Sequence, residues 1–239
     1  MKLNNIKMVV FDVGDTIYQF SNPKLLTNCY NKEMELLRKN GIKFKTQDYY
    51  FATEKAWRES QKKKYDKDYL AVPKLVLKYL GCPENLELVT KMGDSFVKLS
   101  KKYELKNKKM VPGAINIIKY LHKKGYKLGI ISDTKSGWIR NWIKDQKLDT
   151  YFYIIILSFE IGGKKASQKP FLEFKRIAKI KYKIKPSEIM MVGDLSVDMD
   201  AKKHGFKTIL LDPINQKTDH FLYKPDIKIK KLNEIKNYL

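Results

Sequence analysis

The chain has 239 residues and 43% of them are hydrophobic, which is enough to bury the core of one large domain or of one domain with an insertion. No apolar run approaches the roughly 20 residues of a membrane-spanning helix, so we expect no membrane partner. The first residues lack the apolar region of a secretion signal, and Cys29 and Cys82 lack the spacing of a metal site. We therefore expect a cytoplasmic protein with two reduced thiols.

The formal net charge of +23 is the feature of the composition that most invites a nucleic-acid function. However, only 4 of the 49 basic residues are arginines, whose guanidinium makes the bidentate contacts typical of nucleic-acid interfaces. The lysines are also spread along the whole chain. We interpret the charge as a compositional bias of the solvated surface and expect no nucleic-acid partner. The positive field should still attract a small anionic substrate.

Patterns of apolar residues divide the chain into two kinds of segment. Residues 7–11 are predicted to form a strand that is apolar on both faces, as in a parallel sheet. The following residues have helical periodicity without convincing strands. Helices are predicted at 23–39, with Asn22 as its cap and Pro23 in its first turn, and at 46–63, 68–80 and 84–103.

From residue 111 onward, predicted helices and strands alternate. The helices are at 114–124, 135–146, 171–181 and 198–204, and the strands are at 127–131, 153–157, 189–192 and 208–211. Alternation indicates a parallel sheet with helices on both faces, and the first strand must join it because one strand is not stable alone. We expect an α/β fold with a Rossmann-like doubly wound core, residues 1–20 and 107–239. Residues 21–106 would form an inserted α-helical domain that acts as a lid.

Carboxylates follow two of the predicted strands. Asp12 ends the first strand, and Asp194 and Asp198 follow the strand 189–192. Ligands of open α/β sheets bind beyond the carboxyl ends of the strands, and Mg²⁺ prefers a few protein oxygens completed by substrate phosphate. Each aspartate alone fits a turn or a helix cap, but the three together predict a magnesium site.

A hydroxyl and a lysine complete the predicted site. Ser132 follows the strand 127–131 and suits a phosphate oxygen, although by itself it would also fit a simple helix cap. A lysine is needed to offset the charge of carboxylate and phosphoryl groups. Lys169 is a candidate, because Pro170 fixes the start of a helix beside it.

Taken in order, these motifs resemble those of the haloacid dehalogenase-like (HAD) hydrolase superfamily. The four motifs are Asp12-Val13-Gly14-Asp15-Thr16, then Ser132-Asp133, then Lys169-Pro170, and finally Gly193-Asp194-Leu195-Ser196-Val197-Asp198. The helical insertion after the first motif is similar to the helical cap of that family. Four ordered motifs identify the chain as a member.

The resemblance implies covalent chemistry at phosphorus. Asp12 would attack phosphorus and form an aspartyl-phosphate, which water would then hydrolyse. Ser132, Asp133 and Lys169 would bind the phosphoryl group, and Lys169 would also reduce charge repulsion at Asp12. The resemblance assigns Mg²⁺ to Asp12, the backbone carbonyl of Gly14, Asp194 and Asp198.

Two positions depart from the family pattern. The first departure concerns the lysine of the third motif. Lys165 lies at the family's usual distance after Gly162, whereas Lys169 lies at the usual distance before Asp194 and is followed by proline. We favour Lys169. Gly14 stands where phosphatases of the family have the aspartate that protonates the leaving group and activates water. Such assistance is worth roughly 10²–10⁴ in rate.

Three functions therefore stay open. The favoured function is a Mg²⁺-dependent phosphatase of a small phosphate ester, because a metal-free dehalogenase would not need Asp194 and Asp198. The second is cleavage of a carbon–halogen or carbon–phosphorus bond, since such relatives also lack an aspartate at the position of Gly14. The third is a non-catalytic member that binds phosphate. The sequence does not identify the substrate, and it leaves a homodimer open.

Overall fold

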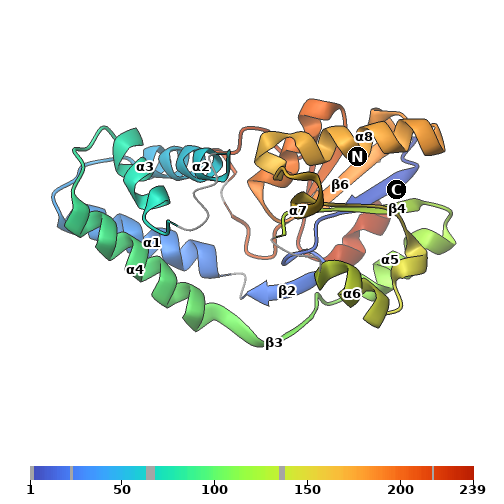
Figure 1. Cartoon of the computed structure of the whole chain (residues 1–239), viewed down its shortest axis with the longest axis horizontal. Coiled ribbons are helices and arrows are strands. Elements are labelled where there is room, and N and C mark those ends of the chain that lie inside the picture. Colours follow the sequence, from blue (N-terminus) through green and yellow to red (C-terminus); the bar gives the residue numbers. More distant parts are fainter. Residues whose placement is uncertain (1–2, 22–23, 63–67, 135–137, 217) are drawn as a thin grey trace. The chain divides into compact units, whose positions relative to one another are not determined.

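The strand β1 (Met8–Phe11) lies inside a six-stranded sheet in the computed structural model, which describes residues 3–21, 24–62, 68–134, 138–216 and 218–239 (Figure 1). All four residues of β1 are apolar and buried, as a strand covered on both faces requires. The other strands of this sheet are β4 (Lys127–Ser132), β5 (Phe152–Leu157), β6 (Ile189–Gly193), β7 (Lys207–Leu211) and β8 (Ile227–Ile229).

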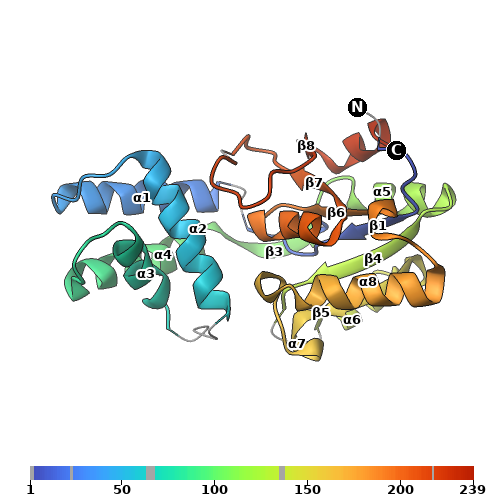
Figure 2. The ribbon, with the colours of Figure 1, turned by 90° about the horizontal axis from the view of Figure 1, so that it is seen from above.

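The strand order is β5-β4-β1-β6-β7-β8, and every neighbouring pair is parallel (Figure 2). The chain therefore builds outward from β1 in two directions, first through β4 and β5 and later through β6 to β8. This reversal makes the carboxyl end of β1 the switch point of the sheet, where doubly wound folds bind ligands. The predicted α/β class and doubly wound sheet are confirmed.

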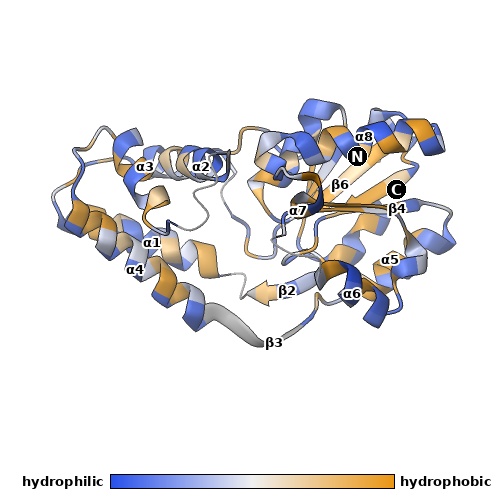
Figure 3. Cartoon of the chain, in the orientation of Figure 1, coloured by the Kyte–Doolittle hydropathy of each residue, from blue (hydrophilic) through white to orange (hydrophobic). Residues whose placement is uncertain are grey.

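Helices cover both faces of the sheet, with α8 (Lys169–Tyr182) on one face and α5 (Ala114–Lys123) on the other (Figure 1). Alternate residues of β1 point to opposite faces. Val9 and Phe11 join the core beneath α5 and α6 (Trp138–Asp145), whereas Met8 and Val10 join the core beneath α8. In Figure 3 the strands β4 and β6 are mostly orange, the colour of hydrophobic residues. The sheet is thus apolar on both sides, which leaves its polar residues at the strand ends.

Three strands of the structure were not predicted from the sequence. β2 (Tyr18–Ser21) and β3 (Glu104–Met110) form a separate two-stranded sheet, and β8 adds an edge strand beside β7. The sequence of β3 is ELKNKKM, which has neither an apolar run nor a clear alternation. The predicted helix at 198–204 is a 3₁₀ helix, Ser196–His204. The starts of the helices predicted at 23–39 and 135–146 and the end of the helix predicted at 46–63 lie outside the described residues.

The chain divides into two compact units. One comprises Met1–Phe20, Asn107–Asn215 and Leu222–Leu239, and the other comprises Ser21–Lys106 and Gln216–Phe221. The second unit contains α1 (Leu25–Lys39), α2 (Thr46–Lys62), α3 (Ala71–Tyr79) and α4 (Leu86–Tyr103). The predicted core domain, residues 1–20 and 107–239, includes 216–221, but in the structure these residues group with the helices. The ring of His220 stacks there on Tyr50 with 5.1 Å between ring centroids.

The helical unit has its own apolar core, drawn from all four helices. Leu37 of α1, Ala56 of α2, Leu77 of α3 and Met92 of α4 are fully buried in it. Within the part of the chain that the structure describes, no helix combines the length and apolar character needed to cross a membrane.

One carboxylic acid is buried in this helical core. Glu33 of α1 is 7% exposed, and it accepts a hydrogen bond of 2.7 Å from the Tyr49 hydroxyl of α2. Burial raises the pKa of Glu33 to about 7, and the Tyr49 hydrogen bond opposes this only in part. Near neutral pH, the folded protein therefore holds a proton on Glu33 that the unfolded chain, with a pKa near 4.5, releases.

Glu33→Gln should make the protein more stable at pH 8 by up to about 3 kcal/mol, and should have little effect near pH 4.5. The folded pKa lies above the unfolded one, so the wild type loses stability as the pH rises from about 4.5 to about 7. The glutamine oxygen can still accept from Tyr49. Urea unfolding of both proteins from pH 4.5 to 8.5 measures this difference. Glu35→Gln on the same helix is the control of opposite sign, because hydrogen bonds from Lys39 and Lys32 lower the pKa of Glu35 and its removal should not stabilise the protein at pH 8. Parallel pH profiles for wild type and Glu33→Gln would contradict the prediction.

Candidate active site

The carboxyl ends of β4, β1 and β6 bring several polar residues together. These strands are neighbours in the sheet, so the residues that follow them meet at one edge. Asp12 follows β1 and is 7% exposed, and its backbone N–H donates to the Val192 carbonyl of β6 at 2.9 Å. Asp133 follows β4, and Asp194 follows β6. The structure therefore clusters the carboxylates that the sequence placed at strand ends.

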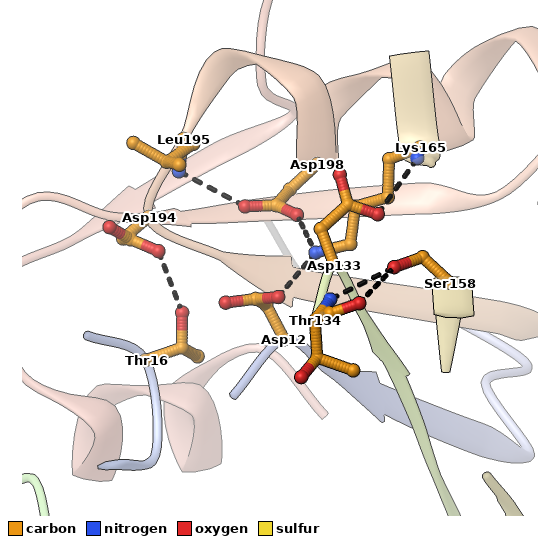
Figure 4. A network of polar contacts seen from close by, with 9 residues as sticks. All are labelled: Asp12, Thr16, Asp133, Thr134, Ser158, Lys165, Asp194, Leu195 and Asp198. Carbon is orange, nitrogen blue, oxygen red and sulfur yellow. Dashed lines mark hydrogen bonds and ion pairs between the residues drawn. The ribbon is translucent and has the colours of Figure 1, made fainter. Parts of the chain in front are cut away.

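Lys165, and not Lys169, contacts these carboxylates (Figure 4). Its buried Nζ donates to Asp12 and, at 2.6 Å, to Asp198. The structure thus places Lys165 where the sequence favoured Lys169. Lys169 is exposed at the start of α8, and its side chain runs beside Gly162 and Gly163. The spacing from Gly162 to Lys165 is the sequence signal that agrees with this placement.

A short loop places the lysine. Lys165 begins the 3₁₀ turn Lys165–Ser167, and Gln168 then takes a left-handed conformation with φ of 70° before α8 begins. The Lys165 backbone N–H donates to Asp133 Oδ1 at 2.9 Å. The Gln168 amide bridges Asp200 at 2.9 Å and the His204 ring at 2.9 Å. The loop is therefore fixed from both ends, which points the Lys165 ammonium into the carboxylate cluster.

Three carboxylates form the centre of the cluster. One oxygen from each of Asp12, Asp194 and Asp198 lies within 4.8 Å of the other two. Thr16 donates to Asp194 Oδ1 at 3.1 Å, and the Leu195 N–H donates to Asp198 Oδ2 at 3.0 Å. These hydrogen bonds orient the carboxylates toward one another despite their mutual repulsion.

The electrostatics of the cluster favour a divalent cation. Burial, together with nearby carboxylates, raises the pKa of Asp12 and raises that of Asp194 well above its usual value. Burial would lower the pKa of Lys165, but Asp12 and Asp198 outweigh it and raise the pKa. When all three carboxylates are ionised, they exceed the one ammonium by two negative charges, and the raised pKa values reflect this repulsion. Hard carboxylate oxygens in this number and spacing fit Mg²⁺, which takes few protein ligands.

Gly193 is required by the way Asp198 folds back over the strand end. A Cβ at position 193 would lie 2.2 Å from Asp198 Oδ2 and 2.3 Å from Asp198 Cγ, so no other residue fits without displacing this carboxylate. The glycine of the predicted fourth motif thus has a steric role in addition to ending the strand.

The two predicted phosphate ligands of β4 differ in their contacts. Ser132 is buried as the last residue of the strand, and its role as a phosphate ligand stays a prediction. Asp133 uses one carboxylate oxygen to hold the Lys165 backbone, so the contact that the structure shows is a positioning one. Ser158, to which the sequence assigned no site role, contacts the backbone of the same loop: its Oγ accepts from the Thr134 N–H at 2.9 Å and donates to the Thr134 carbonyl at 3.0 Å.

Gly14 faces Asp12 beside an aromatic ring. A Cβ at position 14 would lie 3.5 Å from ring carbons of Phe20 and 3.9 Å from Asp12 Oδ2, which are ordinary contacts. The neighbouring Asp15 has a φ of 53°, and its Oδ1 accepts from the Phe20 N–H at 2.7 Å. The role of the Gly14 carbonyl as a metal ligand stays a prediction.

The chain belongs to the haloacid dehalogenase-like hydrolases, since the model of that family matches residues 9–211. The site described above is therefore the candidate active site of a hydrolase.

Two curated relatives carry phosphatase names. A pyrophosphatase PpaX from Anoxybacillus flavithermus is 31% identical over 51% of this chain, and the match spans only 56% of that protein. A glyceraldehyde 3-phosphate phosphatase from Methanopyrus kandleri is 28% identical over 85% of this chain and 83% of that protein. Among solved structures, the HAD hydrolase YfnB from Bacillus subtilis, bound to magnesium, covers 98% of both chains. It has a TM-score of 0.56 and 17% identity, which shows a shared fold.

Proposed function

We propose that this protein is a Mg²⁺-dependent phosphatase that acts on a small phosphate ester through a phosphorylated Asp12. The observation that carries the proposal is the contact of one buried lysine with both Asp12 and Asp198, inside a cluster of three carboxylates. A nucleophile needs access to its substrate and a neighbouring positive charge. Asp12 directly follows β1 at the carboxyl end of the sheet, its side chain keeps 10% of its surface exposed, and Lys165 lies beside it.

The metal assignment rests on the donor set. Asp12, Asp194 and Asp198 would hold the ion, with the Gly14 carbonyl as a further ligand. Bound Mg²⁺ would supply positive charge to the phosphoryl oxygens and to the nucleophile. The magnesium in the structure of YfnB supports this choice of metal, as do the phosphatase names of the relatives.

The chain's own residues account for the first chemical step. An oxygen of Asp12 forms a bond to phosphorus while the bond from phosphorus to the leaving oxygen breaks, and the electron pair departs with that oxygen. Lys165 holds Asp12 in place and offsets the charge that gathers on the phosphoryl group. Ser132 and backbone N–H groups beyond β4 would bind phosphoryl oxygens. Water then attacks phosphorus and releases Asp12 as a carboxylate.

The helical unit, Ser21–Lys106 with Gln216–Phe221, is proposed to be the cap that selects the substrate. The two phosphatase names do not fix that substrate, because one relative acts on a phosphoanhydride and the other on an alkyl phosphate by their names.

A panel of phosphoesters tests the proposal. Purified protein should release phosphate from at least one ester in the presence of MgCl₂. EDTA should lower that rate to background, and excess MgCl₂ should restore it, because the ion held by the three carboxylates would supply positive charge to the phosphoryl oxygens and to Asp12. Phosphate release measured with a dye assay gives the rate. No phosphate release from any ester, or chloride release from a 2-haloacid without metal, would overturn the proposal.

A further inference from the structure

Position 14 is open toward the nucleophile, and the group that would face a leaving oxygen there is missing. Among the described residues, the nearest atoms to a Cβ at Gly14 are two ring carbons of Phe20 and one carboxylate oxygen of Asp12. The first atom of a side chain at this position would therefore lie between the Asp12 carboxylate and the Phe20 ring. The adjacent carboxylate of Asp15 is bonded to the Phe20 backbone instead.

The space beside Gly14 is bordered by aromatic rings. Phe20 packs edge-on against Tyr18 and against Trp138, with 5.1 Å and 5.4 Å between ring centroids. Tyr18 and Trp138 also contact Trp142. Phe20, Tyr18 and Trp138 are each partly exposed, so this aromatic wall reaches solvent beside the nucleophile. The Phe20 ring, which lies nearest to position 14, carries no acidic group, but it can bind a flat ring through stacking.

We propose that the enzyme is specialised for phosphate esters of acidic, aromatic alcohols, such as aryl phosphates. This inference rests on the proposed phosphatase function. With no acid at position 14, the leaving oxygen must depart as an anion. A phenolate does so readily, because its charge is delocalised into the ring, whereas an alkoxide needs a proton. The aromatic wall provides the surface for that ring.

Under this proposal, the two steps of the reaction differ in rate for an aryl phosphate. In the first, the Asp12 oxygen–phosphorus bond forms, the phosphorus–oxygen bond to the ring breaks, and the phenolate leaves with the electron pair and takes its proton from water. In the second, water attacks phosphorus without a base at position 14, and its proton goes to solvent. The second step should be the slower one for an aryl phosphate. One equivalent of phenolate should then appear in a burst before steady turnover.

Three esters and two variants test the proposal. The esters are 4-nitrophenyl phosphate, phenyl phosphate and 2-phenylethyl phosphate, which keeps the ring but leaves as an alkoxide. For the wild type, kcat/KM should fall in this order, by about 10²-fold or more from first to last. Gly14→Asp should raise kcat/KM for 2-phenylethyl phosphate by about 10²-fold and change that for 4-nitrophenyl phosphate only a few-fold. The surroundings of position 14 leave room for the first atom of the new side chain at ordinary contact distances.

Gly14→Asn is the matched control, since it has the same size but transfers no proton. Equal wild-type kcat/KM for 4-nitrophenyl and 2-phenylethyl phosphate would overturn the leaving-group inference while leaving the phosphatase function intact. A gain with Gly14→Asn equal to that with Gly14→Asp would overturn it as well. The absence of phosphate release from all three esters, with and without Mg²⁺, would instead refute the proposed function itself, and this inference with it.

Discussion

Lys165→Met should lower kcat/KM for any phosphoester that the protein hydrolyses by at least about 10²-fold, whereas Lys169→Met should leave it within about three-fold. The reason is position. The Lys165 ammonium contacts both Asp12 and Asp198, while Lys169 is exposed at the start of α8. Steady-state kinetics on the two variants, at saturating Mg²⁺, measure the difference.

The lysine substitution needs a control for folding, because Lys165 is buried among carboxylates. Its removal leaves those carboxylates without a cation, which is costly in a buried site. Thermal melting with and without Mg²⁺ separates loss of folding from loss of chemistry. Lys165→Arg, which keeps the charge, should fold and retain more activity than the methionine variant. A folded Lys165→Met protein with wild-type kinetics would refute the role assigned to Lys165, and so would an inactive Lys169→Met protein.

Asp12→Asn should abolish turnover, with a loss of at least about 10³-fold, and should prevent the protein from acquiring a phosphoryl group. An amide oxygen is a far weaker nucleophile than a carboxylate. The wild type, quenched in acid during turnover, should show the mass of one added phosphoryl group. The variant, treated in the same way, should show none. Stability without metal should not fall, because the substitution removes one charge from an over-negative cluster.

Asp15→Asn is the matched control for the nucleophile. Its amide oxygen can still accept the hydrogen bond from the Phe20 N–H, so the turn after β1 should be retained. This variant should keep its activity within several-fold of the wild type and should still become phosphorylated. If Asp15→Asn abolished phosphorylation and Asp12→Asn did not, the nucleophile would be misassigned.

Much of the core could be read from the sequence because its strands are long apolar runs. Val9, Val10 and Phe11 are followed at once by Asp12, and Met191 and Val192 are followed by Gly193 and Asp194. Burial on both faces explains the runs, and the strand-end position explains the polar residues after them. The strands β2 and β3 carry no such pattern, since they lie outside the large sheet.

The lysine could not be chosen from spacing alone. Lys165 and Lys169 are four residues apart, and each fits one of two counts. Which lysine reaches the carboxylates depends on a 3₁₀ turn and on the left-handed backbone of Gln168. Together they bury Lys165 and leave Lys169 exposed. Such a turn is determined by contacts with Asp133, Asp200 and His204, which come from distant parts of the chain. The spacing of residues within a loop does not predict such contacts with distant residues.

The segment Gln216–Phe221 limits how this protein can be divided or recombined. The polypeptide passes between the two units after Phe20, after Lys106, after Asn215 and after Phe221. A chimera that exchanges only residues 21–106 would bring in foreign helices but keep the native His220, which stacks on Tyr50. Replacing the helical unit as a module therefore takes two grafts, and the second is a six-residue piece between β7 and β8. Any natural or engineered change of the helices must stay compatible with that short piece.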